Sequence, residues 1–215
     1  RGLIWIGTNG YGIRKYNPVN RLFRHYLPGV STRKVHPGPD GQIWVWTSSG
    51  FFSRLDEDAN QIGESILRDK DLFQHDCMFS RDGRFLWVLA QKRDAVDDKS
   101  ILIRKDLQTG AEEQFNGATS SGMYSQLMED GKGNIWIVGS KSDLEQFDPV
   151  SGRSKLYDLS SYTGFKEYSF VLTEDANGHI WIGTPHGLVK GIPTEKGENM
   201  AFLLYKNNPS QFGKD

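Results

Sequence analysis

The pattern of hydrophobic and polar positions divides the chain into short apolar runs separated by turn residues. One phrase recurs in these runs: an aliphatic residue, a tryptophan and a second aliphatic residue, followed by small or polar residues. Its clearest copies, Ile4–Thr8 and Ile180–Thr184, share the sequence Ile-Trp-Ile-Gly-Thr. The tryptophans of the five copies are Trp5, Trp44, Trp87, Trp136 and Trp181, which are 39, 43, 49 and 45 residues apart. Self-similarity at such a period predicts a repeat architecture.

Each copy lies within a series of predicted strands. Short runs of aliphatic and aromatic residues bounded by Gly, Asn and Pro indicate strands joined by hairpins. The fourth repeat has such runs at 125–128, 134–138, 144–147 and 154–157, and the fifth has them at 169–173, 179–182, 187–190 and 200–205. Residues 3–6 are apolar on both parities, which predicts that both faces of this strand are buried. Because no segment sustains apolar spacing at three and four residues, the predicted fold class is all-β.

The repeats are predicted to form a single domain, with approximate boundaries at 1–28, 29–70, 71–118, 119–162 and 163–208. The third repeat departs from the pattern, because a charged stretch at 91–99 stands where the other copies have a tight turn. We interpret this stretch as a solvated loop. A binding loop is the alternative, since insertions in repeat folds map to loops on one face.

Composition and charge remove several classes of function. A formal net charge of -1, from 26 basic and 27 acidic residues, predicts neither a nucleic-acid partner nor an anionic membrane surface. Apolar runs of about five or six residues are far shorter than the roughly 20 that span a bilayer. The single cysteine, Cys77, rules out an internal disulfide and gives no evidence on the compartment.

Around two of the tryptophans, the sequence resembles the two-component regulator propeller repeat, whose consensus runs roughly E-D-x-x-G-x-I-W-I-G-T-x-x-G-L. Residues 129–137 read Glu-Asp-Gly-Lys-Gly-Asn-Ile-Trp-Ile, and residues 174–188 read Glu-Asp-Ala-Asn-Gly-His-Ile-Trp-Ile-Gly-Thr-Pro-His-Gly-Leu. A further family element, an aromatic residue followed by D-P-x-x-G, is similar to residues 147–152. The resemblance covers nearly the whole chain. Repeats one, four and five match specifically, the second matches fairly, and the third would not be recognised alone.

The resemblance implies a β-propeller of four-stranded blades, of which these five repeats are an incomplete part of a larger ring. It also implies a periplasmic, extracytoplasmic sensor module of a hybrid two-component receptor, which responds to glycan oligosaccharides and signals to a histidine kinase outside this chain. The implied partners are an oligosaccharide, the remaining blades and a neighbouring sensor domain, and a homodimer stays open. No enzymatic activity, cofactor or membrane insertion is expected of this segment. Independently, a blade must stack on neighbours to cover its apolar faces, and one Trp ring per blade is expected at each contact.

Two clusters of polar residues suggest chemistry and are interpreted as structural. Strand alternation puts His75 and Cys77 on one face and Asp76 on the other, without a second His or Cys nearby, so no metal site is predicted. Residues 56–60 have Ca²⁺-like spacing but lack the Gly and the acidic residue that complete such a loop, which favours a solvated turn. No catalytic residue is predicted.

Candidate ligand-binding residues follow from the implied propeller, in which the loop after each Trp strand and the connection into each inner strand share one rim. The residues expected there, besides 91–99, are Asn9, Tyr11, Arg33, Tyr124, Lys141, Tyr168 and His186. Aromatic, amide and guanidinium groups suit carbohydrates, through stacking and hydrogen bonds to hydroxyls.

Two alternatives to a sensor stay open. The Gly-x-Ile-Trp repeats are similar to those of the streptogramin lyases, which place a catalytic His and acidic residues near the channel with Mg²⁺. The Gly-Thr-x-x-Gly-Leu ending and the lack of a convincing His/Glu pair count against a lyase. A protein-interaction scaffold is the other alternative, and the sequence does not separate it from a sensor.

Overall fold

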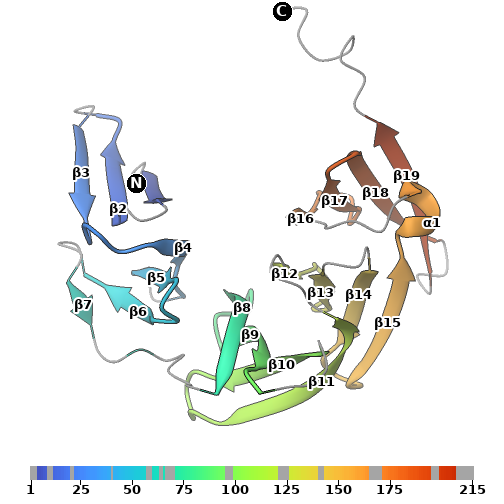
Figure 1. The fold of residues 1–215 in the computed structure, drawn as a ribbon, viewed down its shortest axis with the longest axis horizontal. Helices are drawn as coiled ribbons and strands as arrows, with labels where there is room; N and C mark the ends of the chain where they lie inside the picture. Colours follow the sequence, from blue (N-terminus) through green and yellow to red (C-terminus); the bar gives the residue numbers. More distant parts are fainter. Residues whose placement is uncertain are drawn as a thin grey trace, which may run out of the picture. The chain divides into compact units, whose positions relative to one another are not determined.

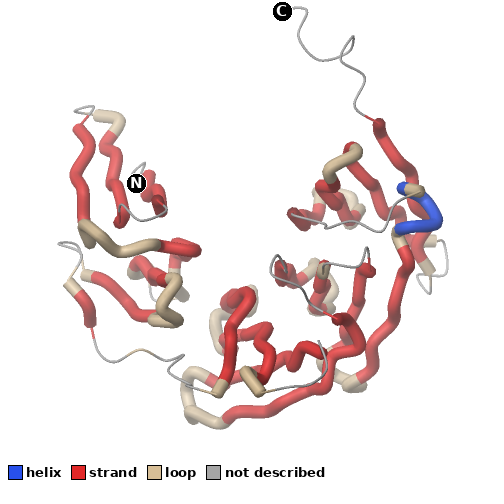
Figure 2. The backbone as a smooth tube through the Cα atoms, in the orientation of Figure 1, coloured by secondary structure: helices blue, strands red, loops and turns tan. Residues whose placement is uncertain are grey.

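The computed structural model describes residues 4–8, 12–19, 22–39, 41–56, 60–62, 65, 71–94, 99–120, 126–139, 143–164, 171–194 and 199–206. These residues form five antiparallel sheets and one short helix (Figure 1 and Figure 2). We call the sheets blades 1 to 5 in chain order. The predicted all-β class is confirmed, and each blade contains one of the five recurring tryptophans.

Each blade is a meander in which consecutive strands pair. Blade 1 consists of β1 (Ile4–Thr8), β2 (Gly12–Asn17) and β3 (Leu22–Tyr26). Blade 2 consists of β4 (Thr32–Pro37), β5 (Ile43–Thr47), β6 (Phe52–Leu55) and β7 (Gln61–Ile62). Blade 3 consists of β8 (Leu72–Phe79), β9 (Phe85–Lys92), β10 (Lys99–Asp106) and β11 (Glu112–Ser120).

The last two blades have the same four-stranded order. Blade 4 consists of β12 (Gln126–Glu129), β13 (Ile135–Val138), β14 (Asp143–Asp148) and β15 (Arg153–Asp158). Blade 5 consists of β16 (Val171–Glu174), β17 (Ile180–Thr184), β18 (Gly187–Pro193) and β19 (Met200–Lys206). Between them lies a helix that the sequence pattern does not predict, α1 (Ser160–Thr163), which ends at Gly164 in the left-handed conformation.

The chain divides into two compact units, residues 1–70 with 82–84 and residues 71–81 with 85–215. Blades 1 and 2 lie in the first unit, and blades 3 to 5 lie in the second. Within the second unit, neighbouring blades pack through unlike faces. The face with the tryptophan of one blade (the Trp face) covers the face with the flanking isoleucines of the next (the Ile face). The two buried clusters pair Trp87 and Leu89 with Ile135 and Ile137, and Trp136 and Val138 with Ile180 and Ile182.

In the first unit, the Trp face of blade 1 is likewise covered by blade 2, where Trp5, Val35 and Ile43 pack against a buried cluster of Ile13, Val45 and Leu55. The opposite face of β1 exposes Ile4 and Ile6, at 51% and 41% of their surface. The prediction that both faces of this strand are buried is therefore wrong. Alternate residues point to opposite faces, and within the described first unit a sheet covers just the Trp face.

Carboxylates add hydrogen bonds between the blades of the second unit. A carboxylate oxygen of Glu129 in blade 4 accepts the Arg81 N–H of blade 3 at 2.7 Å. Glu174 of blade 5 accepts the Gly131 N–H of blade 4 at 3.0 and 2.9 Å, and the Arg81 guanidinium at 2.6 Å. The Glu of the repeat consensus thus bonds the preceding blade.

We call the first strand of each four-stranded blade its inner strand. In the second unit, hydrogen bonds also join the inner strands of neighbouring blades. Oδ2 of the buried Asp76 on β8 accepts the Leu127 N–H of β12 at 2.8 Å. Oε1 of Gln126 on β12 accepts the Leu172 N–H of β16 at 2.7 Å. Buried backbone groups need such partners, so these side chains fix how adjacent inner strands lie together.

The Asp of the repeat consensus organises the turn before the Trp strand in blades 4 and 5. Oδ2 of Asp130 accepts the indole N–H of Trp136 at 2.8 Å, and Oδ2 of Asp175 accepts that of Trp181 at 2.9 Å. Gly178 lies in the second turn at φ +76, a conformation that glycine adopts without strain. The pKa of Asp175 is well below its ordinary value, because the Trp181 indole, the His179 ring and turn N–H groups bind its ionised form.

Candidate functional site

In each blade with an inner strand, the Trp strand ends where the inner strand begins. The strand registers pair Thr32 with Thr47, Leu72 with Lys92, Gln126 with Val138, and Val171 with Gly183. Within each blade, the loop after the Trp strand and the entry into the inner strand therefore lie at one end. That these ends gather in one rim across the blades stays a prediction.

Two of the predicted ligand-binding residues lie in the described chain, both exposed at this end of their blades. The guanidinium carbon of Arg33, in the first unit, lies 5.2 Å from the centroid of the Trp46 ring. The backbone N–H of His186, in the second unit, donates to Thr184 Oγ1 at 3.3 Å. The other predicted residues, Asn9, Tyr11, Tyr124, Lys141 and Tyr168, lie outside the described residues. A role in ligand binding stays a prediction for all seven.

Blade 3 extends beyond its neighbour at this end. Its Trp strand continues five residues past Trp87 to Lys92, whereas that of blade 4 ends two residues past Trp136, at Val138. The three additional residues add about 10 Å to the strand. The charged stretch 91–99 is thus only partly the predicted loop, because strand pairing continues through Gln91 and Lys92. Residues 95–98 lie outside the described chain.

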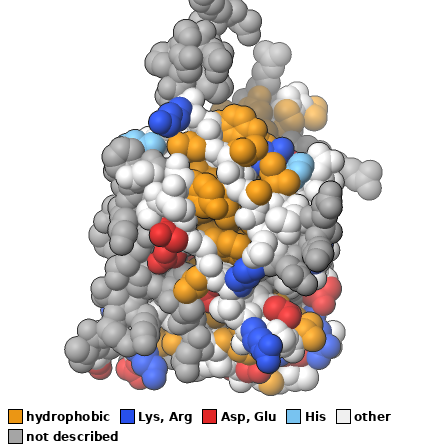
Figure 3. Space-filling view, turned by 90° about the vertical axis from the view of Figure 1, so that its right-hand side faces the viewer, with side chains coloured by type: hydrophobic (Ala, Val, Ile, Leu, Met, Phe, Trp, Pro, Cys, Tyr) orange, Lys and Arg blue, Asp and Glu red, His pale blue; other side chains and the backbone are white. Residues whose placement is uncertain are grey.

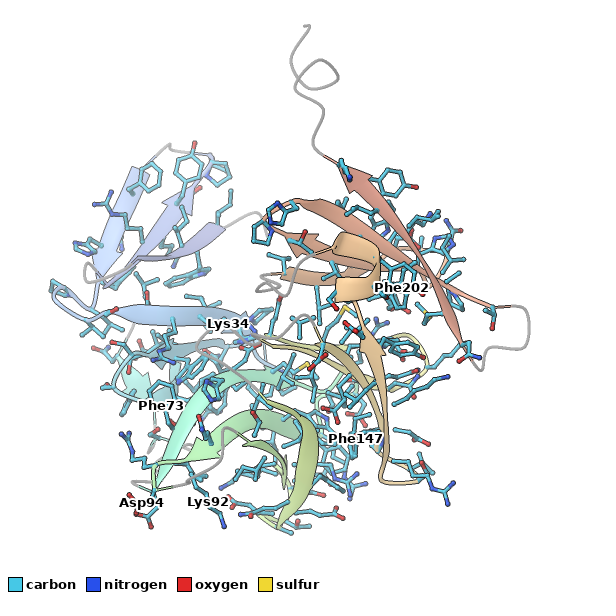
Figure 4. All side chains as sticks on the ribbon, turned by 45° about the vertical axis from the view of Figure 1, so that its right-hand side comes forward. Lys34, Phe73, Lys92, Asp94, Phe147 and Phe202 are labelled. Atoms are coloured by element: carbon cyan, nitrogen blue, oxygen red, sulfur yellow. The ribbon has the colours of Figure 1, made fainter. Side chains whose placement is uncertain are left out.

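An aromatic and cationic cluster lies at this extended end, and we call Phe73, His75, Gln91 and Arg93 the hairpin cluster. The ring centroids of Phe73 and His75 are 5.2 Å apart at an interplanar angle of 70°. The guanidinium carbon of Arg93 lies 6.0 Å from the Phe73 centroid, and the Arg93 N–H donates to the Asp71 carbonyl at 2.9 Å. Figure 4 labels Phe73 on β8, with Lys92 and Asp94 at the end of β9.

The register explains how the hairpin cluster comes together. Phe73 pairs with Gln91, and both share the face of Trp87, since Trp87, Leu89 and Gln91 alternate along β9. The register shifts between Gln74 and Asp76, so a β-bulge at His75 interrupts the alternation that the sequence interpretation assumes. Such bulges re-aim side chains.

The cluster has the groups that recognise a polar ring compound. Phe73 is half-buried, and the exposed Arg93 side chain lies over the Phe73 ring. An aromatic face stacks on the apolar face of a sugar, and guanidinium and amide groups hydrogen-bond hydroxyls. The sequence interpretation identified the region through its charged insertion but did not select Phe73, because an aromatic residue in a strand looks like a core residue.

A second exposed surface lies on the outer strands of blades 4 and 5. The ring centroids of Tyr157, on β15, and Tyr162, on α1, lie 5.5 and 5.1 Å from that of Phe202. Figure 3 views this side, where hydrophobic side chains gather. Burial raises the pKa of Tyr157, whose hydroxyl lies 3.1 Å from Gln146 Oε1. Tyr157 packs against the buried cluster between blades 4 and 5, and Phe202 is part of that cluster.

In the described chain, residues of the two polar clusters singled out in the sequence form local hydrogen bonds. Cys77 is buried, as expected, and the Oδ1 atom of Asp76 accepts its N–H at 2.8 Å. Asp56 accepts two hydrogen bonds from Asn60, at 2.8 and 3.0 Å, and residues 57–59 of the predicted turn lie outside the described residues. Among the described residues, no group of three or more His, Cys, Asp and Glu side chains could hold a metal ion.

Comparisons with known proteins agree with this architecture. Among solved structures, the chain is similar to the extracellular domain of the hybrid two component system BT3049 from B. thetaiotaomicron, with a TM-score of 0.69 and 17% identity over 97% of this chain. It is also similar to the extracellular domain of the hybrid two component system BT4673 from the same organism, with a TM-score of 0.65 and 18% identity over 95% of this chain. The chain spans 27% and 30% of the lengths of these two chains.

No protein of curated function matches the chain. In the described residues, no helix has the length and hydropathy that a membrane crossing requires. The family model described as Two component regulator propeller matches residues 165–186, which include the turn around Asp175 and the tryptophan of blade 5. The shared fold and the matched repeat therefore identify this chain as a β-propeller segment whose fifth blade contains a two component regulator propeller repeat.

Proposed function

We propose that this chain is a sensor module in the extracytoplasmic, periplasmic part of a two-component receptor, which signals to a histidine kinase outside the chain. The observation that carries the proposal is the match of residues 165–186 to the two component regulator propeller family. The fold shared with extracellular domains of two such systems supports it. The partners in this proposal are the neighbouring blades and sensor domain of the receptor.

We further propose that the module binds an oligosaccharide at the hairpin cluster of blade 3. The Phe73 ring would stack on the apolar face of a sugar, while Arg93 and Gln91 would hydrogen-bond its hydroxyl groups. A net charge of -1 gives little long-range attraction for a polyanion, which favours a neutral or weakly charged glycan.

The test measures binding of a panel of neutral and acidic oligosaccharides to the purified chain by calorimetry, followed by two substitutions. Phe73→Ala and Arg93→Ala are each expected to weaken binding about tenfold, which corresponds to ~1.4 kcal/mol. Matched controls are Arg84→Ala, on the turn at the opposite end of blade 3, and Tyr162→Ala, an exposed aromatic residue on α1.

The outcomes separate the parts of the proposal. Binding that neither hairpin substitution weakens, or that the controls weaken equally, would rule out the hairpin cluster as the site. No binding of any oligosaccharide would contradict the carbohydrate ligand. Kinase output from the intact receptor that responds to the ligand, and loses its response with Arg93→Ala, is the expected result for a sensor.

A further inference from the structure

The inner strand of blade 2 contains a β-bulge close to the end of its Trp strand. The register between β4 and β5 shifts between Thr32 and Lys34, and Lys34 pairs with Trp46. Regular alternation would put Arg33 and Lys34 on opposite faces of the sheet. The bulge re-aims Arg33, whose guanidinium carbon lies 5.2 Å from the centroid of the Trp46 ring. Two neighbouring cationic residues therefore lie beside one tryptophan.

The indole N–H of Trp46 is a buried donor that has no hydrogen-bond acceptor among the described residues. Trp46 is 2% exposed. By contrast, Asp130 and Asp175 accept the indole N–H groups of Trp136 and Trp181, at 2.8 and 2.9 Å. A buried donor without an acceptor costs about 1–3 kcal/mol, and such donors are rare in folded proteins. An acceptor on a bound molecule would remove this cost at Trp46.

The chain segments around Trp46 are basic in sequence. Residues 30–39 and 41–55, which include β4, β5 and β6, contain Arg33, Lys34 and Arg54 but no Asp or Glu. The whole chain, in contrast, has 26 basic and 27 acidic residues. Arg33 is exposed, and Lys34, which Figure 4 labels, is half-buried. The charge of these segments therefore favours an anionic acceptor at the Trp46 N–H.

We propose that Arg33, Lys34 and the indole N–H of Trp46 form a binding site for the carboxylate group of a small ligand. One carboxylate oxygen accepts the indole N–H, and the guanidinium of Arg33 donates to the carboxylate. Lys34 adds a second positive charge beside Trp46. Arg33 and Lys34 also have other contacts, which an Arg with five N–H donors and a Lys with three can keep while they bind a ligand.

The Arg33 side chain is the movable cover of this site. It lies over the Trp46 ring from an exposed position, and exposed side chains change rotamer within picoseconds to nanoseconds. A planar carboxylate matches the fork of a guanidinium. A phosphate is commonly bound by several backbone N–H groups at a helix N-terminus, and the described residues of blade 2 form no helix. The site therefore suits a carboxylate better than a phosphate.

Nuclear magnetic resonance of the six indole N–H groups of the purified chain tests the proposal. The Trp46 signal is the one that Trp46→Phe removes. Without ligand, it is expected upfield of the Trp136 and Trp181 signals, because those groups donate to carboxylates and hydrogen bonding moves a proton signal downfield. Sodium glucuronate should move the Trp46 signal downfield until the site is saturated. Glucose, its uncharged counterpart, should leave the signal in place.

Substitutions of exposed or half-buried cations make the result specific. Arg33→Ala should weaken glucuronate binding about tenfold, because it removes the charged donor that faces the carboxylate. Lys34→Ala should weaken it less, since Lys34 contributes a point charge without the planar fork. Arg14→Ala, which removes an exposed cation from β2 in blade 1, is the matched control and should leave binding unchanged. Added sodium chloride should weaken binding to the unmodified chain.

Three results would overturn the proposal. A ligand-free Trp46 signal as far downfield as those of Trp136 and Trp181 would show that a buried water already accepts this N–H. An unchanged signal with glucuronate, or an equal shift with glucose or in Arg33→Ala, would exclude the carboxylate site. An equal shift with inorganic phosphate would show a general anion site instead. The signal reports on blade 2 alone, so failure here is distinct from failure of the proposed oligosaccharide site on blade 3.

Discussion

The two units achieve similar apolar packing with different polar groups. In the second unit, the turn before the Trp strand of blade 4 begins with Glu129 and Asp130, which bond the preceding blade and the indole. In the first unit, the corresponding positions of blade 2 are Pro37 and Gly38, which have no side-chain acceptor. The Trp44 ring there stacks on Phe52 at 5.2 Å.

The difference shows that two kinds of information are superimposed in each repeat. Alternation of Trp with aliphatic residues is sufficient to form a sheet with two packing faces, and all five blades have it. The Glu and Asp of the consensus accept the additional hydrogen bonds between and within blades. Repeat three, which has Phe79 and Ser80 at these positions, accordingly looks degenerate in sequence although its blade is fully formed.

The largest expected effect comes from replacing Trp136, which takes part both in the apolar packing and in a hydrogen bond to Asp130. Trp136→Ala should lower the free energy of unfolding by about 3–5 kcal/mol, because it opens a cavity in the buried cluster. Trp136→Phe refills much of that volume but deprives Asp130 of a donor, at a cost of about 1–3 kcal/mol. Urea unfolding measures both. A Trp136→Phe variant as stable as the unmodified chain would contradict the role of the turn carboxylate.

An intermediate effect is expected at the inner strands. Asp76→Ala leaves the Leu127 and Cys77 N–H groups without their acceptor, and should destabilise the protein by about 2–3 kcal/mol. Asp76→Asn should recover part of this loss, since its amide oxygen still accepts. Val171→Ala, at the equivalent position of blade 5, should change the unfolding midpoint little, because Val171 is exposed and its side chain accepts no hydrogen bond. If Val171→Ala were as damaging as Asp76→Ala, the acceptor role of Asp76 would be contradicted.

The smallest expected effect is a pH dependence. The pKa of Asp175 is lowered from its ordinary value of 3.8, so its ionised form stabilises the fold above that value. As the pH falls from about 5 through 3.8, the unfolded chain takes up the proton first, and this stabilisation is lost progressively below that range.

The measurement compares the melting temperatures of the unmodified chain and Asp175→Asn at pH 7 and pH 3, where the gap should shrink. Asp148→Asn is the control. The Ser151 hydroxyl and the Val150 N–H lower the pKa of Asp148, but no indole contributes. A difference in melting temperature that widens toward pH 3 would contradict the predicted loss of Asp175 stabilisation at low pH.

The sequence predicts the blades well because its strongest signal is local. A Trp between two isoleucines, preceded by a turn with Gly, defines one strand and its two faces without any long-range knowledge. The acceptor roles of Asp76 and Glu174 are out of reach, since their donors lie 51 and 43 residues away and depend on how blades superpose. The bulge at His75 and the contact of Phe73 with Arg93 likewise require the register of β8 against β9.

The unlike faces of each blade also bear on how such a chain lengthens in evolution. A sheet that offers its Trp face forward and its Ile face backward can follow any other sheet of the same kind. Tandem duplication of one repeat therefore creates a new contact that is already complementary, without compensating substitutions elsewhere. Loss of a repeat restores an old contact by the same rule. Blades of this type can be gained and lost as whole units, while the loops at one end are free to diverge.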